Sequence, residues 1–335
     1  MKIGVVGCGA LGTYYGARLT QGGHEVHFLL RSDYHTVRRQ GVRISSWQGD
    51  CSAQPQCANR PQDIGHCELT LVTLKTTANN RLVDLVPPLV GPKTLILTLQ
   101  NGLGNEAALA TIFGPDNILG GLCFICVNRI APGCIRHLAH GKIVIGEYGR
   151  PLSRRLFSLA SSFDKAGIPC TAVDDLDRAH WEKLVWNIPF NGLGVASAAG
   201  LEAVISGHMA CSGRTFPCLT TDRLLSIPDW FALVEELMRE IISTAEALGH
   251  TIPRNFAELQ IKLTREMGTY RASTLIDFEK GMPLELQSMF ELPLRKAAAT
   301  GVATPRLRSL VSVLRELNPT GASPAASLSE GSLPT

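Results

Sequence analysis

The stretch that decides the fold lies at the start of the chain, where residues 2–12 read KIGVVGCGALG. A strand is predicted over Lys2–Val6 and a helix over Ala10–Gln21, with the pattern Gly-x-Gly-x-x-Gly between them. At such a junction the first glycine permits a tight turn and the second lets a pyrophosphate approach the backbone. The third glycine lets helix and strand pack closely. We therefore expect dinucleotide contacts along this turn, from Gly7, Cys8, Gly9, Ala10, Leu11 and Gly12.

The first half of the chain continues with alternating apolar runs and helical patterns. Further strands are predicted over residues 25–30, 69–74 and 94–99. This alternation predicts βαβ units and a mostly parallel sheet with right-handed crossovers. Between residues 117 and 147, β-rich segments are joined by turn residues, which predicts antiparallel strands that finish the sheet. The expected fold class is α/β, with an N-terminal domain of the Rossmann type.

The second half is mostly helical, and the domain boundary is expected near residues 174–180. A short strand is predicted near 170–173, and the helices are predicted over 153–166, from Asp177 through HWEKLVWN, 225–248, 255–266, 284–300 and Pro305–Leu317. Residues 319–335 are small, polar and rich in proline, with few apolar side chains to bury, so we expect a disordered tail.

Length and charge exclude several classes of protein. The 335 residues exceed the ~250–300 at which a single core stops growing, so two domains are expected. The net charge is only +3, whereas a nucleic-acid-binding protein normally carries a strong excess of basic residues. No apolar run approaches the ~18–20 residues of a membrane span, and the N-terminus is predicted to be a strand, not a signal peptide. We expect a cytoplasmic protein without nucleic-acid or membrane partners.

The ten cysteines predict free thiols and not a disulfide framework in such a protein. Cys123 and Cys126 form a C-x-x-C pair inside a predicted strand, where odd spacing places them on opposite faces and disfavours a redox motif. Cys134, His137 and His140 have no evident fourth ligand. We therefore expect no metal site.

Polar residues at the ends of predicted strands indicate where a ligand binds. Arg31 ends the second strand, where NAD enzymes carry an acidic residue for the ribose 2′-hydroxyl. A guanidinium suits a 2′-phosphate, which favours NADPH/NADP+ as the cofactor. Lys75 and Asn101 end two further strands, and the carboxyl ends of parallel strands share one edge of a sheet. One crevice is therefore expected to contain these three side chains and the glycine turn.

A second polar pattern lies in the helical half. Lys183, Asn187 and Asn191 are spaced by four, and each such step on a helix drifts by only ~40°. Neighbours in this series share a face and could bind and protonate a polar substrate. Taken alone, the pattern also fits a plain polar stripe on an amphipathic helix.

The chain resembles the ketopantoate reductase (2-dehydropantoate 2-reductase) family over about residues 1–318. The motifs that carry the resemblance are GCGALG with Arg31, TLK at Lys75, QNGLGNE at Asn101, APGCIRHLAHGKIVIGE, HWEKLVWNIPFN, YRASTLIDFEKGMPLE and GVATP. The resemblance implies an NADPH-binding Rossmann-type domain over residues 1–175. It also implies a helical substrate domain over 176–318, of the 6-phosphogluconate dehydrogenase C-terminal-like type. The implied reaction is the NADPH-dependent reduction of 2-dehydropantoate to (R)-pantoate, in pantothenate and coenzyme A biosynthesis.

The resemblance also implies residue roles. Lys183 matches the catalytic lysine, which gives a proton to the carbonyl oxygen, and Glu285 matches the glutamate that engages this lysine and the substrate. The positions that match substrate contacts are Asn101, Asn187, Asn191 and Ser273. Asn101 also reaches the cofactor, and Arg31 and Lys75 match residues that recognise its phosphate and ribose groups.

Three features depart from the family pattern. Pro189 stands inside the predicted catalytic helix, where the bend it imposes would rotate Asn191 away from Lys183. Residues 201–218 look like an insertion, and residues 287–290 lack the Asp and Asn that commonly follow the glutamate. The identity of the keto acid is therefore less firmly indicated than the type of reaction.

Several alternatives stay open at this point. The chain could reduce another 2-keto acid, or it could be a non-catalytic NADPH-binding sensor whose inserted segment binds a partner. An NAD enzyme of the hydroxyacid dehydrogenase type is disfavoured by Arg31. The expected partner is a small-molecule 2-keto acid, and a homodimer is left open.

Overall fold

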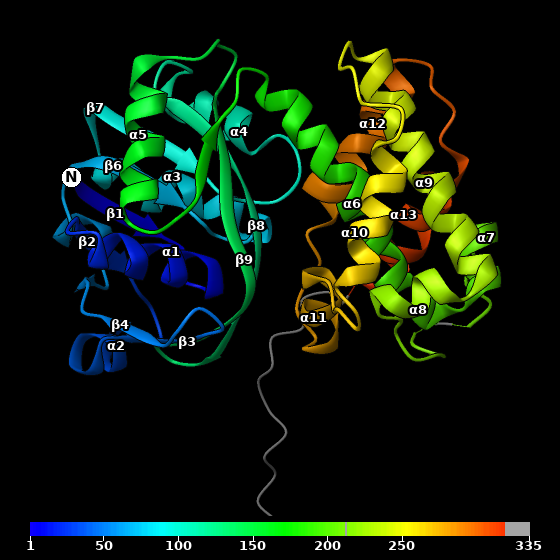
Figure 1. Ribbon diagram of the computed structural model, residues 1–335, viewed down its shortest axis with the longest axis horizontal. Coiled ribbons are helices and arrows are strands. Elements are labelled where there is room, and N and C mark those ends of the chain that lie inside the picture. The colour runs from blue at the N-terminus through cyan, green and yellow to red at the C-terminus, as the bar shows by residue number, and fades with distance from the viewer. Residues whose placement is uncertain (212, 319–335) are drawn as a thin grey trace, which may run out of the picture.

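The protein has two lobes, one built on a large sheet and one built from helices (Figure 1). The structure is a computed structural model that describes residues 1–211 and 213–318. The tail predicted to be disordered, residues 319–335, lies outside the described residues. The two-part architecture confirms the predicted fold class.

The first lobe contains one ten-stranded sheet. Its strands are β1 (Lys2–Val6), β2 (Glu25–Leu29), β3 (Val42–Ser46), β4 (Cys51–Ala53), β5 (Gln56–Ala58), β6 (Cys67–Val72), β7 (Val90–Thr98), β8 (Ile118–Ala131), β9 (Cys134–Glu147) and β10 (Cys170–Ala172). Their order is β4-β3-β9-β8-β7-β6-β1-β2-β5, and β10 pairs with β9. The strands β8 to β2 form the parallel part, and their carboxyl ends supply the polar residues identified above.

The predicted antiparallel hairpin is present as β8 and β9, but it does not finish the sheet. One end of β9 pairs with β3, and β4 continues the sheet beyond β3. These two strands follow α2 (Tyr34–Gln40), in a region for which no strand was predicted. The long hairpin extends beyond the parallel strands, so β3 can pair with its distal end.

Helices cover the sheet and build the second lobe. The remaining α-helices are α1 (Ala10–Gln21), α3 (Leu82–Leu85), α4 (Asn105–Phe113), α5 (Arg154–Lys165), α6 (Leu176–Ala196), α7 (Leu201–Ser206), α8 (Thr221–Ser226), α9 (Pro228–Ala247), α10 (Phe256–Glu266), α11 (Ser273–Glu279), α12 (Leu292–Ala299) and α13 (Pro305–Leu317). Short 3₁₀ turns are η1 (Pro61–Asp63), η2 (Thr76–Arg81), η3 (Pro87–Leu89) and η4 (Ser197–Ala199), and η5 (Gln287–Glu291) is a π-helix. Within the described residues, no helix combines the length and apolarity needed to cross a bilayer.

Two predicted helices differ in detail from the structure. The predicted helix over 225–248 is split into α8 and α9 at Ile227, whose backbone is extended (φ −97°, ψ 118°). The cause is Pro228, since a proline disfavours the helical conformation of the preceding residue. The predicted helix over 284–300 instead begins with the π-turn η5, followed by α12 with Pro293 in its first turn.

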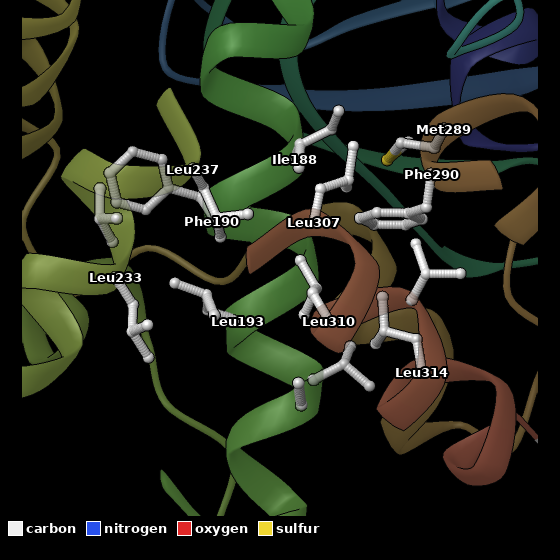
Figure 2. Close-up of a cluster of buried hydrophobic side chains, with 14 of the residues drawn as sticks. Ile188, Phe190, Leu193, Leu233, Leu237, Met289, Phe290, Leu307, Leu310 and Leu314 are labelled. Atoms are coloured by element: carbon white, nitrogen blue, oxygen red, sulfur yellow. The ribbon is translucent and has the colours of Figure 1, made fainter. Parts of the chain in front are cut away.

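Helix α6 links the two lobes. Its first part lies on β8 and β9, and its second part runs through the core of the helical lobe between α9 and α13 (Figure 2). Ile188, Phe190 and Leu193 are almost completely buried there. Pro189 lies inside the helix, which nevertheless continues to Ala196. The segment proposed as an insertion, 201–218, begins with α7, and residue 212 lies outside the described part.

Candidate active site

One cavity of about 1590 Å³ is lined by residues from both lobes. This exceeds the ~300–1,000 Å³ usual for a single small ligand, so the cavity has room for two. Of the residues predicted for the site, it is lined by Gly7, Cys8, Gly9, Ala10, Leu11, Arg31, Lys75, Asn101, Lys183, Asn187, Asn191, Ser273 and Glu285. Gly12 is the exception, because it packs inside the fold.

Each of the three glycines in the turn is a glycine for a different structural reason. Gly7 has φ +108°, and a Cβ on it would lie 2.6 Å from the backbone carbon of Thr73. A Cβ on Gly12 would lie 2.5 Å from the carbonyl oxygen of Gly7, so this glycine permits the close helix–strand contact. A Cβ on Gly9 would meet no protein atom within 4 Å. The backbone at Gly9 is therefore open to a ligand, as a dinucleotide turn requires.

This difference predicts opposite effects for two alanine substitutions. Gly7→Ala should lower the free energy of unfolding by roughly 2–4 kcal/mol, because the left-handed backbone and the contact with Thr73 are both unfavourable. Gly9→Ala should leave stability within about 0.5 kcal/mol and weaken dinucleotide binding, since its methyl group enters the cavity. Urea unfolding and fluorescence titration with NADPH separate the two effects. Equal losses of stability in Gly7→Ala and Gly9→Ala would contradict the assignment of Gly7 to the fold and of Gly9 to ligand binding.

Arg31 follows β2 and is exposed at the cavity wall. Asp33, two residues later, could repel a phosphate, but its carboxylate is already bound. Ser32 Oγ donates to Asp33 Oδ1 at 2.9 Å, and Arg129 Nη1 donates to Asp33 Oδ2 at 2.7 Å. The acid is therefore compensated, and Arg31 adds a positive charge to this end of the cavity.

Lys183 and Asn101 meet across the two lobes. Lys183 Nζ donates a hydrogen bond to Asn101 Oδ1 at 2.9 Å. Burial lowers the pKa of Lys183 below its ordinary value, against the opposing effects of Cys123 and Glu285. A lysine with a lowered pKa gives up its proton more readily, which suits a general acid near neutral pH.

Glu285 is placed differently from the expectation that it engages Lys183. Its carboxylate is buried, accepts a hydrogen bond from Thr76 N at 2.7 Å, and lies 3.5 Å from Lys75 Nζ. Lys75 Nζ also donates to Asp277 Oδ2 at 2.7 Å. Within the described residues Glu285 thus pairs with Lys75 and not with Lys183, although its charge still acts on Lys183. Burial lowers the pKa of Lys75, but the carboxylates of Glu285 and Asp277 outweigh burial and raise it.

The remaining predicted residues line the same cavity. Asn191 stays on the cavity side with Lys183 despite Pro189, so the expected rotation away from the site does not occur. Its Oδ1 accepts hydrogen bonds from Thr274 N at 3.0 Å and from Ser273 Oγ at 3.3 Å. The first turn of α11 therefore fixes the amide.

Some residues of the site were not predicted from the sequence. Gln100 Nε2 donates to Leu74 O at 2.9 Å and to Asn79 Oδ1 at 2.7 Å, which joins the segments that follow β6 and β7. Gln100 is the first residue of the motif QNGLGNE, so this motif could have identified it as a site residue. Trp186 and Tyr270 form an aromatic part of the cavity wall, with ring centroids 6.2 Å apart. Aromatic residues are common in helical cores, and no spacing distinguished these two.

The expectation that Cys123 and Cys126 lie on opposite faces of the strand is wrong. Cys123 and Cys126 both line the cavity, because a register irregularity between Phe124 and Ile125 interrupts the alternation of β8. Burial raises the pKa of Cys123 to about 11. Across the part of the chain that the structure describes, no three His, Cys, Asp or Glu side chains are grouped to hold a metal ion.

Comparison with known proteins gives consistent matches over both lobes. The family described as ketopantoate reductase PanE/ApbA matches residues 3–150, and its C-terminal counterpart matches residues 215–318. A 2-dehydropantoate 2-reductase from Nostoc sp. is 38% identical over 323 residues, which cover 95% of each chain.

Solved structures agree with this result. A crystal structure of 2-dehydropantoate 2-reductase from Geobacter metallireducens is 41% identical and has a TM-score of 0.85, covering 94% of this chain and 99% of that one. The corresponding structure from Methylococcus capsulatus is 35% identical, with a TM-score of 0.81 and coverage of 94% and 96%. A D-mandelate dehydrogenase with bound NADH, 17% identical with a TM-score of 0.79, shares the fold. The chain belongs to the ketopantoate reductase PanE/ApbA family of oxidoreductases.

Proposed function

We propose that this chain reduces 2-dehydropantoate to (R)-pantoate with NADPH, a step towards pantothenate and coenzyme A. The observation that carries the proposal is the contact between Lys183 and Asn101, in the same cavity as the glycine turn. A proton donor and a dinucleotide site are the two parts that reduction of a carbonyl requires. The chain's similarity to 2-dehydropantoate 2-reductases supports the choice of substrate.

The residues at the sheet edge suit a nicotinamide dinucleotide. The open backbone at Gly9 and the first turn of α1 offer N–H groups and a positive helix end to a pyrophosphate. Arg31 would bind the 2′-phosphate that distinguishes NADPH from NADH. Lys75 would meet a ribose or phosphate group. When bound, the reduced dinucleotide supplies the hydride that adds to the 2-keto carbon.

The proposed role of Lys183 is that of general acid. As negative charge grows on the carbonyl oxygen, the ammonium group stabilises it and then transfers a proton, so that the ketone becomes an alcohol. Asn101 orients the ammonium through the 2.9 Å hydrogen bond. The substrate carboxylate and hydroxyl would be bound by two amides on the helix of Lys183, Asn187 and Asn191, and by the hydroxyl of Ser273.

Glu285 should control the pH dependence of this step. The protonated lysine is the active form, so kcat falls as pH rises through the pKa of Lys183. The negative charge of Glu285 raises that pKa. Glu285→Gln removes the charge, and the alkaline fall in kcat should therefore move to lower pH. The measurement is kcat against pH at saturating substrate and dinucleotide.

Asp277→Asn provides the matched control for this shift. Asp277 also pairs with Lys75, but it is not among the groups that perturb the pKa of Lys183. The alkaline fall should therefore keep its position in Asp277→Asn, whatever happens to KM for the dinucleotide. A shift of the same size in both variants would mean that Glu285 acts through Lys75, and the proposed coupling to Lys183 would be wrong.

The substrate is tested with a panel of 2-keto acids. Initial rates of NADPH oxidation should give 2-dehydropantoate one of the highest values of kcat/KM. If a different branched or hydroxylated 2-keto acid is much better, the reductase assignment stands and the substrate assignment fails. Tight NADPH binding without oxidation by any member would favour a sensor.

The division of labour between the lobes is also part of the proposal. Residues 1–175 would hold the dinucleotide, and residues 176–318 would supply the acid and most substrate contacts. The division is supported by the position of α6, which begins at Leu176 and carries Lys183.

A further inference from the structure

A buried pair of ionisable side chains joins the lobes next to the proposed site. His180 Nε2, on α6, lies 3.0 Å from Glu106 Oε1, at the start of α4. Each residue is only 5% exposed. Neither Glu106 nor His180 is among the described residues that line the cavity, so the proposed chemistry does not use these two side chains directly.

Packing energy alone does not account for such a pair. Burying two polar or charged groups carries a desolvation penalty that their attraction roughly offsets, and apolar residues of similar volume are often as stable. A buried polar pair does, however, accept only one alignment of the two elements that carry it. Its best-attested use is to fix register.

The pair lies between two other contacts that α6 makes with the sheet lobe. Leu176, His180 and Lys183 follow the spacing i, i+4, i+7 and therefore share one face of the helix. Leu176 packs where β8 and β9 have glycines, since a Cβ on Gly120 would lie 2.6 Å from its side chain and a Cβ on Gly146 2.8 Å. One turn after His180, the same face ends at Lys183 and its contact with Asn101.

Asn101, the partner of Lys183, is held by the same first turn of α4 that carries Glu106. Asn105, the neighbour of Glu106, is 1% exposed, and its Nδ2 donates to Asn101 O at 3.1 Å. Asn105 Oδ1 in turn accepts from Asn79 Nδ2 at 3.3 Å. In the first turn of α4, Asn105 thus holds the backbone of Asn101, and the next residue, Glu106, contacts His180 on α6.

We infer that the Glu106–His180 pair is a positioning device that sets Lys183 against Asn101. The pair fixes the height and rotation of α6 on the dinucleotide-binding lobe at the turn that also holds Asn101. The inference rests on the proposed function, in which this contact orients the proton donor. Glu106 and His180 are positioning residues, and they act through Lys183.

The test compares variants of the pair in two backgrounds. In the wild-type background, His180→Ala and Glu106→Ala should each lower kcat roughly 10–100-fold, because a displacement of about 1 Å at a reacting group has effects of this size. Their Kd for NADPH should stay within about twofold. Glu106→Gln keeps an acceptor oxygen for His180 and should recover most of the rate. In the Lys183→Ala background, His180→Ala should cause no further loss.

Glu147→Ala is the matched control for buried pairs. Glu147 is 3% exposed and pairs with Arg155, and neither of these two residues lines the cavity. This variant should lose stability with kcat unchanged. If it lowers kcat as much as His180→Ala, or if His180→Ala lowers the residual rate of Lys183→Ala, the pair has only a general structural role and the inference is wrong. If His180→Ala does not fold, Glu106→Ala takes its place in both backgrounds and is compared with Glu147→Ala by the same criteria.

A second readout does not depend on turnover. The pH dependence of Lys183 acetylation by acetic anhydride, followed by mass spectrometry, reports the pKa of its amine. In His180→Ala the released ammonium should gain contact with solvent, and its pKa should rise towards the ordinary value. In Glu147→Ala it should not change. A wild-type protein that reduces no 2-keto acid would overturn the proposed function, whereas an unchanged pKa in His180→Ala would overturn the positioning role.

Discussion

Replacing Lys183 with alanine is expected to lower kcat by roughly 100–10,000-fold, the range typical of lost acid–base chemistry. Without the ammonium, the charge that grows on the carbonyl oxygen loses its proposed cationic hydrogen-bond donor. The Kd for NADPH should change little, because the dinucleotide would be held mainly by the sheet edge. Steady-state rates with 2-dehydropantoate, combined with fluorescence titration of NADPH, measure both quantities.

Lys262→Ala is a suitable control for this experiment. Lys262 lies on α10, is exposed, and does not line the cavity. Its loss should leave kcat and KM unchanged. A near-wild-type kcat in Lys183→Ala would show that another group or a water molecule delivers the proton, and the assigned role of Lys183 would be wrong.

Replacing Arg31 with alanine should weaken NADPH binding by roughly 10–100-fold and leave NADH binding nearly unchanged. The guanidinium would make charge-assisted hydrogen bonds to the 2′-phosphate, each of which contributes about 1.5–3 kcal/mol. NADH has no phosphate at that position. The Kd values of both dinucleotides give the answer without any keto acid.

Arg39→Ala controls for the general loss of positive charge. Arg39 is an exposed residue of α2, eight positions from Arg31, and it does not line the cavity. It should leave both Kd values within about twofold. Equal weakening of NADPH and NADH in Arg31→Ala would remove the basis for NADPH preference.

Much of the fold could be predicted because local signals and tertiary structure agree. The strand, turn and helix over residues 2–21 form as predicted, since the glycine pattern is set by the geometry of that turn. The strands β4 and β5 were missed because each has only three residues. β3 was missed because its place in the sheet depends on pairing with β9, which is distant in the sequence. The break at Ile227 was missed because the apolar periodicity continues through it, although Pro228 was a local signal.

The site was predictable as two separate sets of residues, but their mutual contacts were not. Strand ends pointed to Lys75 and Asn101, and helical spacing pointed to Lys183. The partner of Lys75, Asp277, is 202 positions away, and no local pattern indicates which of two acids a distant lysine meets. For the same reason the pairing of Glu285 with Lys75 and Thr76 emerged only when the two lobes were assembled.

The proposed chemistry requires one cavity to bring a reduced dinucleotide, a keto acid and the Lys183 ammonium together. Its most direct test is the product balance of the purified protein with NADPH and 2-dehydropantoate, by absorbance for NADPH and mass spectrometry for pantoate. One pantoate should form for each NADPH oxidised, and turnover should be abolished or greatly slowed in Lys183→Ala. If NADPH binds tightly but stays unoxidised and no pantoate forms, the proposed chemistry is wrong.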